Sequence, residues 1–322
     1  MKHHNILSEI EKPRKSISRD KKAEIKEHQL GLVIKDDSEY YQNKLPINLK
    51  RICSCGPTHI NCLTPKEWLK SQLGVWQFYY ETRDIRDKTL HPATFPISLA
   101  KKVIELFSHR GELVLDPFVG SGTTIIASNK IGRKCIGIDL NPSYKKLAKS
   151  RIARYGFSDY TYITGDSNIE LNKIDVVDYI VTSPPYHNIL RNHSNGTRKY
   201  NGRQYRMGAR EGVQYYSDYK NDLGNFEEYS QYIASLKEIM GKCFLKLHKG
   251  KYCTIIISDF TINKKEVCVQ ADIVKLMQDI GFDFCGTTAL FQTVKPLYPF
   301  GYPYAYKINH HHQNMITFQK PK

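Results

Sequence analysis

The sequence LVLDPFVGSGTT at residues 113–124 decides the fold. Its first three residues are apolar and predict a short buried strand, and a helix is predicted to begin at about Thr123. Between these two elements, Gly120 and Gly122 carry no Cβ, so the backbone can turn tightly there and approach a ligand closely. A strand, a glycine-rich turn and a helix in this order predict the first unit of an α/β fold with a mainly parallel sheet.

The same alternation continues along the chain. Further strands and helices are predicted in turn, at strand-like residues 135–138, 160–164, 179–182, 253–257, 285–292 and 315–318 and helix-like residues 142–154, 226–247 and 267–280. Strands that alternate with helices form βαβ units, which supports the parallel sheet. Upstream, Thr64, Pro65 and Glu67 have the pattern of a helix start with a capping box.

Acidic residues follow the second and third predicted strands. Asp139 closes the second strand, where a carboxylate can accept hydrogen bonds from ribose hydroxyls, and Asp166 closes the third, where it can reach an adenine amino group. The sequence lacks the full dinucleotide glycine fingerprint and also lacks the Gly-Lys-Ser/Thr of a P-loop. We therefore expect a ligand that contains adenosine and is neither NAD nor a P-loop nucleotide.

The sequence YIVTSPPY at residues 179–186 is the expected place of the chemistry. Two prolines stop the predicted strand and stiffen the loop after it, because each fixes φ and removes a backbone donor. Ser183 and Tyr186 are thereby held at the carboxyl end of a strand, which is where ligands bind in open α/β sheets.

The chain is strongly basic, with a formal charge of +16. Such a surface favours a polyanion, with nucleic acid as the first candidate and an inert basic surface as the alternative. Residues 188–225 are rich in Arg and Tyr with almost no helical or strand period, so we predict an inserted loop that contacts DNA, with a solvated loop as the alternative. The cationic candidates in it are Arg191, Arg198, Lys199, Arg203, Arg206 and Arg210. We expect a polar extension over residues 1–60 and a catalytic domain over residues 61–322.

No apolar run approaches the roughly 18 residues needed to cross a bilayer, and the start of the chain has no secretory h-region. Eight cysteines then predict reduced thiols and a cytoplasmic protein. Cys53, Cys55, His59 and Cys62 form a candidate zinc cluster, but Cys-x-Cys is tighter than the usual spacing and no second pair follows. We therefore predict free thiols and no metal.

Two of these motifs together resemble a known family. DPFVGSGTT at residues 116–124 and TSPPY at residues 182–186 look like the S-adenosylmethionine-dependent amino methyltransferases of DNA, which methylate cytosine N4 or adenine N6. HPATFP at residues 91–96 is similar to the family's methionine-side cofactor motif, and residues 299–304 and 312–318 resemble its carboxyl-terminal strands. The resemblance covers roughly residues 64–320.

The resemblance implies a Rossmann-like, seven-stranded, mainly parallel sheet with one antiparallel strand and helices on both faces. It implies S-adenosylmethionine as the cofactor, bound by Thr94, Phe95, Asp116, Pro117, Phe118, Gly120, Ser121, Gly122, Thr123, Asp139 and Asp166. It places Ser183, Pro184, Pro185 and Tyr186 at the target base.

The chemistry agrees with this placement. Ser183 and the Pro184 carbonyl could accept the hydrogens of an exocyclic amine, and Tyr186 could stack on a flipped base. Ser before Pro-Pro is the form usual for cytosine N4, so we predict a cytosine-N4 methyltransferase of double-stranded DNA, in a restriction-modification system with a partner endonuclease. The alternatives are adenine-N6 methylation, methylation of an RNA base, and a nucleic-acid-binding module that has lost catalysis.

Overall fold

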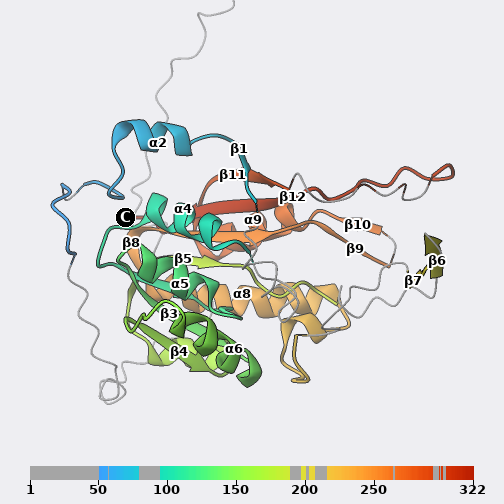
Figure 1. Ribbon diagram of the computed structural model, residues 1–322, viewed down its shortest axis with the longest axis horizontal. Helices are drawn as coiled ribbons and strands as arrows, with labels where there is room; N and C mark the ends of the chain where they lie inside the picture. Colours follow the sequence, from blue (N-terminus) through green and yellow to red (C-terminus); the bar gives the residue numbers. More distant parts are fainter. Residues whose placement is uncertain are drawn as a thin grey trace, which may run out of the picture. The chain divides into compact units, whose positions relative to one another are not determined.

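The computed structural model describes residues 51–56, 58–79, 95–188, 216–263, 265–292, 297, 299 and 302–322, together with the backbone of residues 197–200 and 203–206. All of them belong to one compact unit, Ser38–Lys322. Figure 1 shows its elements.

An eight-stranded sheet forms the centre of this unit. Its strands lie in the order β1 (Val75–Gln77), β11 (Asp283–Phe291), β12 (His312–Gln319), β8 (Leu247–Ile257), β5 (Val177–Thr182), β2 (Leu113–Asp116), β3 (Lys134–Asp139) and β4 (Tyr160–Thr164). Only β12 runs antiparallel to its neighbours, β11 and β8, whereas the other pairs are parallel. The predicted fold class and its single antiparallel strand are therefore confirmed.

The predicted strand number of seven is wrong by one. The added strand is β1, which pairs with β11 at the edge of the sheet. Only its central residue, Trp76, is buried, so its three residues carry too little alternation to be recognised as a strand.

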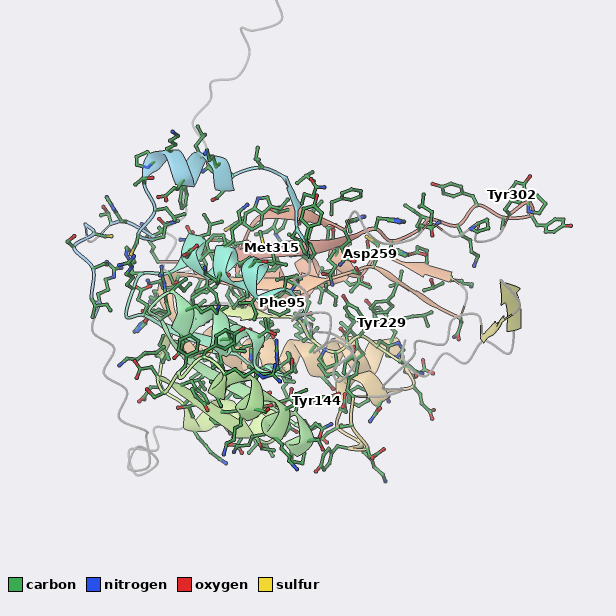
Figure 2. All side chains as sticks on the ribbon, in the orientation of Figure 1. Phe95, Tyr144, Tyr229, Asp259, Tyr302 and Met315 are labelled. Carbon is green, nitrogen blue, oxygen red and sulfur yellow. The ribbon has the colours of Figure 1, made fainter. Side chains whose placement is uncertain are left out.

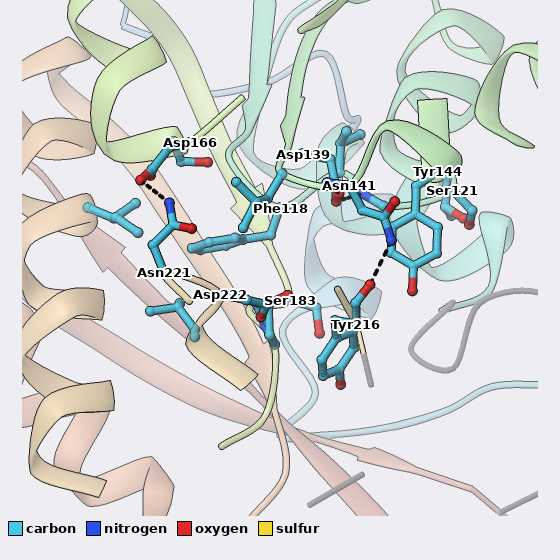
Figure 3. Close-up of a pocket in the computed structure, with 18 of the residues that line it drawn as sticks. Phe118, Ser121, Asp139, Asn141, Tyr144, Asp166, Ser183, Tyr216, Asn221 and Asp222 are labelled. Carbon is cyan, nitrogen blue, oxygen red and sulfur yellow. Dashed lines mark hydrogen bonds between the residues drawn. The ribbon is translucent and has the colours of Figure 1, made fainter. Parts of the chain in front are cut away.

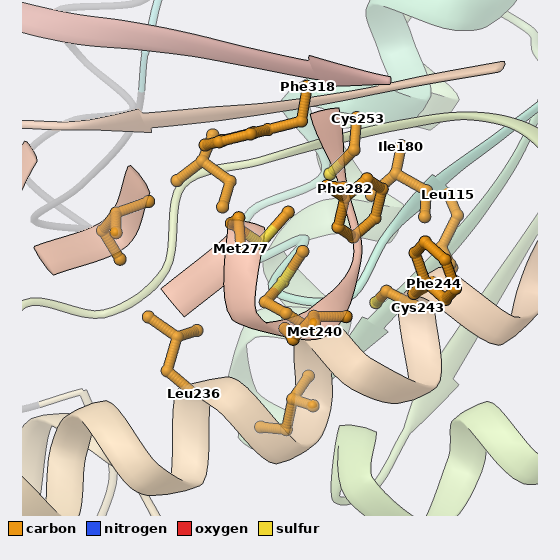
Figure 4. Close-up of a cluster of buried hydrophobic side chains, with 14 of the residues drawn as sticks. Leu115, Ile180, Leu236, Met240, Cys243, Phe244, Cys253, Met277, Phe282 and Phe318 are labelled. Atoms are coloured by element: carbon orange, nitrogen blue, oxygen red, sulfur yellow. The ribbon is translucent and has the colours of Figure 1, made fainter. Parts of the chain in front are cut away.

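Helices cover both faces of the sheet. One face packs on α4 (Ile97–Phe107), α5 (Thr123–Lys130) and α6 (Pro142–Ala153), and the other on α8 (Tyr229–Lys246) and α9 (Val269–Ile280). Successive strand residues point to opposite faces, so Val114 joins the first cluster of buried side chains whereas Leu115 joins the second. Figure 4 shows the second cluster, in which Leu115 and Ile180 of the sheet meet Met240 and Phe244 of α8.

Shorter elements complete the described chain. They are α2 (Pro65–Ser71), α7 (Ser167–Glu170), β9 (Phe260–Ile262), β10 (Lys265–Val267) and the 3₁₀ turns η2 (Leu171–Lys173) and η3 (Leu223–Asn225). The capping box of α2 forms as predicted, because the Thr64 side chain accepts from the Glu67 N–H while the Glu67 carboxylate accepts from the Thr64 N–H.

Residues 188–225, whose sequence has almost no helical or strand period, contain some regular structure where the chain is described. β6 (Thr197–Tyr200) and β7 (Arg203–Arg206) pair as an antiparallel hairpin, and η3 lies near the end of the span. The sequence cue was the Asn201-Gly202 pair, a strong hairpin-turn signal between two short segments that alternate poorly.

Candidate active site

A pocket lies at the carboxyl edge of the sheet, beyond the ends of β2, β3 and β5. It is open to solvent along one side. Its walls come from the turn after β2, the turn after β3, the start of α7, the loop after β5 and the segment 216–223 (Figure 3).

Asp116 links three elements at this edge of the sheet through hydrogen bonds. The side chain is buried; its Oδ1 accepts from the Thr182 hydroxyl at 2.7 Å, and its Oδ2 accepts from the Thr124 hydroxyl at 2.5 Å. Burial raises the pKa of Asp116 to about 6. These bonds join β2, β5 and α5, so the carboxyl group fixes the turn and does not itself line the pocket.

The glycine-rich turn is shaped by close packing. Gly122 has a φ of +83°, and a Cβ at this position would lie 3.0 Å from the Cβ of Ala148 in α6, so both the conformation and the space favour glycine. In β3, a Cβ on Gly137 would lie 2.5 Å from the Val119 side chain. The turn therefore lies directly on β3 and α6, with its backbone facing the pocket.

Arg151 of α6 supports the same turn from beneath and was missed by the sequence predictions. Its guanidinium is buried and donates to the Ser121 carbonyl at 2.7 Å, the Ser121 hydroxyl at 2.7 Å and the Thr123 hydroxyl at 3.1 Å. Charged hydrogen bonds of this kind are stronger than neutral ones, so Arg151 holds the turn in one conformation.

Asp139 faces the pocket from the end of β3. One carboxylate oxygen accepts from the Gly120 N–H at 2.8 Å and the other from the Asn141 N–H at 2.9 Å. Burial raises the pKa of Asp139 to about 7. Each oxygen retains a lone pair that could accept from a ligand hydroxyl.

The segment 216–223 closes the pocket opposite these turns. Asp166 accepts from the Asn221 side-chain amide at 2.6 Å, and the Asn141 side-chain amide donates to the Tyr216 carbonyl at 2.7 Å (Figure 3). Tyr216 itself is buried. No sequence pattern predicted this wall, because Asn221 and Tyr216 meet Asp166 and Asn141 only through folding.

The loop after β5 contributes the remaining wall. Ser183 and Pro185 line the pocket, and Pro184 is buried. The Tyr186 hydroxyl accepts from the Ser258 N–H at 3.2 Å and from the Gln313 side-chain amide at 3.0 Å. The residue after β8 and a residue of β12 therefore fix the ring of Tyr186, which also packs against Phe260 at 5.9 Å between centroids.

The structure brings most of the predicted site residues together. The predicted residues that line the pocket are Phe95, Phe118, Gly120, Ser121, Thr123, Asp139, Asp166, Ser183 and Pro185. The predicted residues that support it without lining it are Asp116, Pro117, Gly122, Pro184 and Tyr186. Thr94, Arg191, Arg210 and the side chains of Arg198, Lys199, Arg203 and Arg206 lie outside the described residues.

The pocket fits S-adenosylmethionine by the chemistry of its walls. Asp139 presents carboxylate oxygens for hydroxyl groups, the Gly120 turn brings backbone close, and the Phe118 ring lies between Asp139 and Asn221 where a flat base could stack (Figure 3). Together with the single antiparallel strand of the sheet, these features define a Rossmann-like fold with a pocket suited to S-adenosylmethionine.

Comparison with known proteins shows which family of proteins the chain resembles. The family model of the N6/N4 DNA methylases matches residues 4–150. The chain is 47% identical over 90 residues to the type II methyltransferase M.SmaI of Serratia marcescens, covering 28% of this chain and 30% of that protein. It is 32% identical over 123 residues to the type II methyltransferase M.BglI of Bacillus subtilis, covering 38% of this chain and 32% of that protein.

These matches bear out the predicted resemblance to the S-adenosylmethionine-dependent DNA amino methyltransferases and support S-adenosylmethionine as the cofactor. The matched part spans about a third of the length of these curated relatives. Among solved structures, the crystal structure of TrmN from Thermus thermophilus matches with a TM-score of 0.46 at 15% identity, over 73% of this chain and 52% of that chain. In the described part of the chain, no helix has both the length and the apolar character that a membrane crossing requires.

Proposed function

We propose that this protein transfers a methyl group from S-adenosylmethionine to the exocyclic N4 of cytosine in double-stranded DNA. The observation that carries the proposal is the position of Ser183. It lies on the pocket wall at the carboxyl end of β5, within Thr-Ser-Pro-Pro-Tyr, and faces the same space as the Gly120 turn and Asp139.

The chain's own residues divide the pocket between cofactor and base. Asp139 would accept hydrogen bonds from the ribose hydroxyls, Asp166 with Asn221 would lie at the adenine, and Phe95 would lie on the methionine side. Bound S-adenosylmethionine supplies an electrophilic methyl group on a sulfonium.

Ser183 then acts on the nucleophile. An exocyclic amine is a poor nucleophile because its lone pair is delocalised into the ring. The Ser183 hydroxyl and the Pro184 carbonyl would accept the two amine hydrogens, which orients the lone pair toward the methyl group. Methyl transfer would form the new N–C bond as the sulfonium C–S bond breaks with its electron pair left on sulfur, and the methylated amine would then lose one proton to solvent. Fixed acceptors at the place where positive charge develops on the amine lower the barrier, and no covalent enzyme intermediate is required.

We assign the stacking contact with the target base to Tyr186. Its hydroxyl is held by Ser258 and Gln313, so the ring is positioned before any base arrives. A ring fixed in this way could stack on a flipped base without losing further rotational freedom.

Two segments of the chain suit a nucleic acid. In the sequence, the insertion 188–225 directly follows the catalytic loop, and one of its residues, Tyr216, lies on the pocket wall. Tyr302, Tyr304 and Tyr306 are between 81% and 95% exposed in the segment that joins β11 to β12, and both strands meet that segment at the carboxyl edge of the sheet. Figure 2 shows Tyr302 near the far end of this segment. The tyrosines exposed at this edge could stack on bases, and the arginines in the sequence of the insertion could contact phosphates.

The alternative base is adenine, methylated at N6 by the same arrangement. The family model covers both kinds of enzyme, and Ser183 is the single residue that favours cytosine. We further propose that the enzyme serves a restriction-modification system with a cognate endonuclease, in keeping with its type II relatives.

Product analysis tests the proposal. The protein is incubated with unmodified duplex DNA or with RNA, and with S-adenosylmethionine that carries an isotopically labelled methyl group. The nucleic acid is then digested to nucleosides for mass spectrometry. Labelled N4-methylcytosine from DNA is the expected product. Labelled N6-methyladenine selects the alternative, and label in RNA alone contradicts both.

A further inference from the structure

We propose that Cys53, Cys55, Cys62 and His109 bind a structural zinc ion. Three cysteines of the amino-terminal segment and one histidine from the turn before β2 bring four ligand atoms within 4.8 Å of one another. The proposal replaces the prediction that the cysteines serve no metal, because His109 supplies the fourth ligand that the local spacing lacks.

The two distances from the histidine to the thiols match a tetrahedral site. His109 Nδ1 lies 3.4 Å from Cys53 Sγ and 3.5 Å from Cys62 Sγ. Zinc bonds of about 2.3 Å to sulfur and about 2.1 Å to nitrogen, at tetrahedral angles, place sulfur and nitrogen about 3.6 Å apart. All three cysteines are free thiols, so none is consumed in a disulfide.

The ring of His109 is already oriented for metal binding. Its Nε2–H donates to the His59 carbonyl at 2.8 Å, and this bond leaves the lone pair of Nδ1 directed at the thiols. The side chain is fully buried. A hydrogen bond from the second ring nitrogen to a carbonyl is the usual support of a metal-bound histidine.

The backbone around His109 is equally fixed. The His109 N–H donates to the Glu112 carboxylate at 2.8 Å, and Glu112 is paired with Arg51 at 3.0 Å and with Lys251 at 2.6 Å. The two ion pairs hold the Glu112 carboxylate in place, and Glu112 in turn holds the backbone of His109.

The location of the cluster and the number of its protein ligands indicate that the zinc has a structural role. His109 precedes β2, so the cluster lies at the amino edge of the parallel strands, whereas the pocket lies at their carboxyl edge. Four protein ligands leave no open coordination position for a substrate. The ion would fasten residues 53–62 to the turn between α4 and β2, where Ile52 and Asn61 already bond to Arg110 and Leu106.

Metal analysis of the full chain, purified without added chelator, tests the site. We expect about one zinc per chain, measured by plasma mass spectrometry. Cys62→Ser should reduce the zinc content to a small fraction of that value. The matched controls are Cys268→Ser, which removes an exposed thiol elsewhere, and His59→Gln, because His59 contributes its carbonyl and not its ring. Both should keep the zinc.

A second measurement on the unmutated chain stays informative even if Cys62→Ser does not fold. Replacement of the metal by Co²⁺ should give the visible absorption of tetrahedral cobalt together with sulfur-to-cobalt charge transfer. Removal of zinc by a chelator should lower the melting temperature. Purified chain without stoichiometric metal, iron with inorganic sulfide in place of zinc, or a disulfide among Cys53, Cys55 and Cys62 would each overturn the proposal. None of these readouts depends on methyl transfer.

Discussion

The two halves of the pocket are built in different ways. The cofactor half comes from the consecutive turns after β2, β3 and β4, and its supports, Asp116 and Arg151, are buried and hydrogen-bonded to neighbouring turns. The target half combines the loop after β5 with Ser258 and Gln313, which are more than 70 residues away in the sequence. The residues proposed to contact the cofactor therefore lie mostly in local sequence patterns, with supports from distant segments, whereas the position of Tyr186 at the proposed base site depends on long-range packing. If this division is correct, single substitutions should change either cofactor affinity or the rate of methyl transfer, but not both.

Ser183→Ala should have the largest effect on the target half. It removes one proposed acceptor of the amine hydrogens, so we expect kcat for DNA methylation to fall about 100-fold or more. Affinity for S-adenosylmethionine, measured by calorimetry, should stay within about twofold. Ser143→Ala, on the exposed surface of α6, is the matched control. A variant that keeps its rate would remove Ser183 from the mechanism.

Arg151→Met should destabilise the glycine-rich turn that forms part of the cofactor half. It deletes charged hydrogen bonds to Ser121 and Thr123 at a buried position, and we expect the free energy of unfolding to fall by about 3 kcal/mol in chemical denaturation. Weaker cofactor binding should accompany the loss. Lys149→Met, which removes an exposed charge from the same helix, should cost less than about 0.5 kcal/mol. Equal losses in the two variants would show that the turn does not depend on Arg151.

Cofactor affinity should depend on pH through Asp139. Burial raises its pKa to about 7, so the carboxyl group gains a proton as the pH falls below that value. The protonated group accepts fewer hydrogen bonds from ribose hydroxyls. Affinity should therefore be constant above about pH 7 and fall by up to about tenfold per pH unit below it. Calorimetry across this range should show a flat profile for Asp139→Asn, and an unchanged slope in that variant would assign the titration to another group.

Tyr186→Phe should have the smallest effect. The ring stays, but the hydroxyl that accepts from Ser258 and Gln313 is lost, and two neutral hydrogen bonds are worth about 1 kcal/mol each. We expect kcat to fall by a few-fold to tenfold, with no change in cofactor affinity. Tyr219→Phe, at an exposed tyrosine, serves as the control. A loss as large as that of Ser183→Ala would mean that the hydroxyl takes part in the chemistry.

The sequence predicted the features that depend on neighbouring residues. The strand, glycine turn and helix around Gly120, the acids that close β3 and β4, and the proline-stiffened loop at Ser183 are all local patterns. Their positions on a common edge follow from the parallel order of the strands. For this reason the fold class and nine of the nineteen pocket-lining residues could be recognised before the structure.

The missed residues depend on contacts between distant segments. Arg151 lies in a basic helix that resembles a solvated surface, and only the packing of α6 under the glycine turn buries it. Asn221 reaches Asp166 across 55 residues of sequence, and His109 reaches Cys62 across 47. Such pairs leave no periodic signal in the sequence, because the position of neither residue follows from the residues next to it in the chain.

The division of the pocket between cofactor and base can be tested by titrating the methylation rate with cofactor. Single-turnover rates on duplex DNA are measured against S-adenosylmethionine concentration for Asp139→Ala and Ser183→Ala. The Asp139 variant should approach the unmutated rate at saturating cofactor, whereas the Ser183 variant should stay about 100-fold below it at every concentration. Rescue of the Ser183 variant by cofactor, or an equally low plateau for both, would contradict the account.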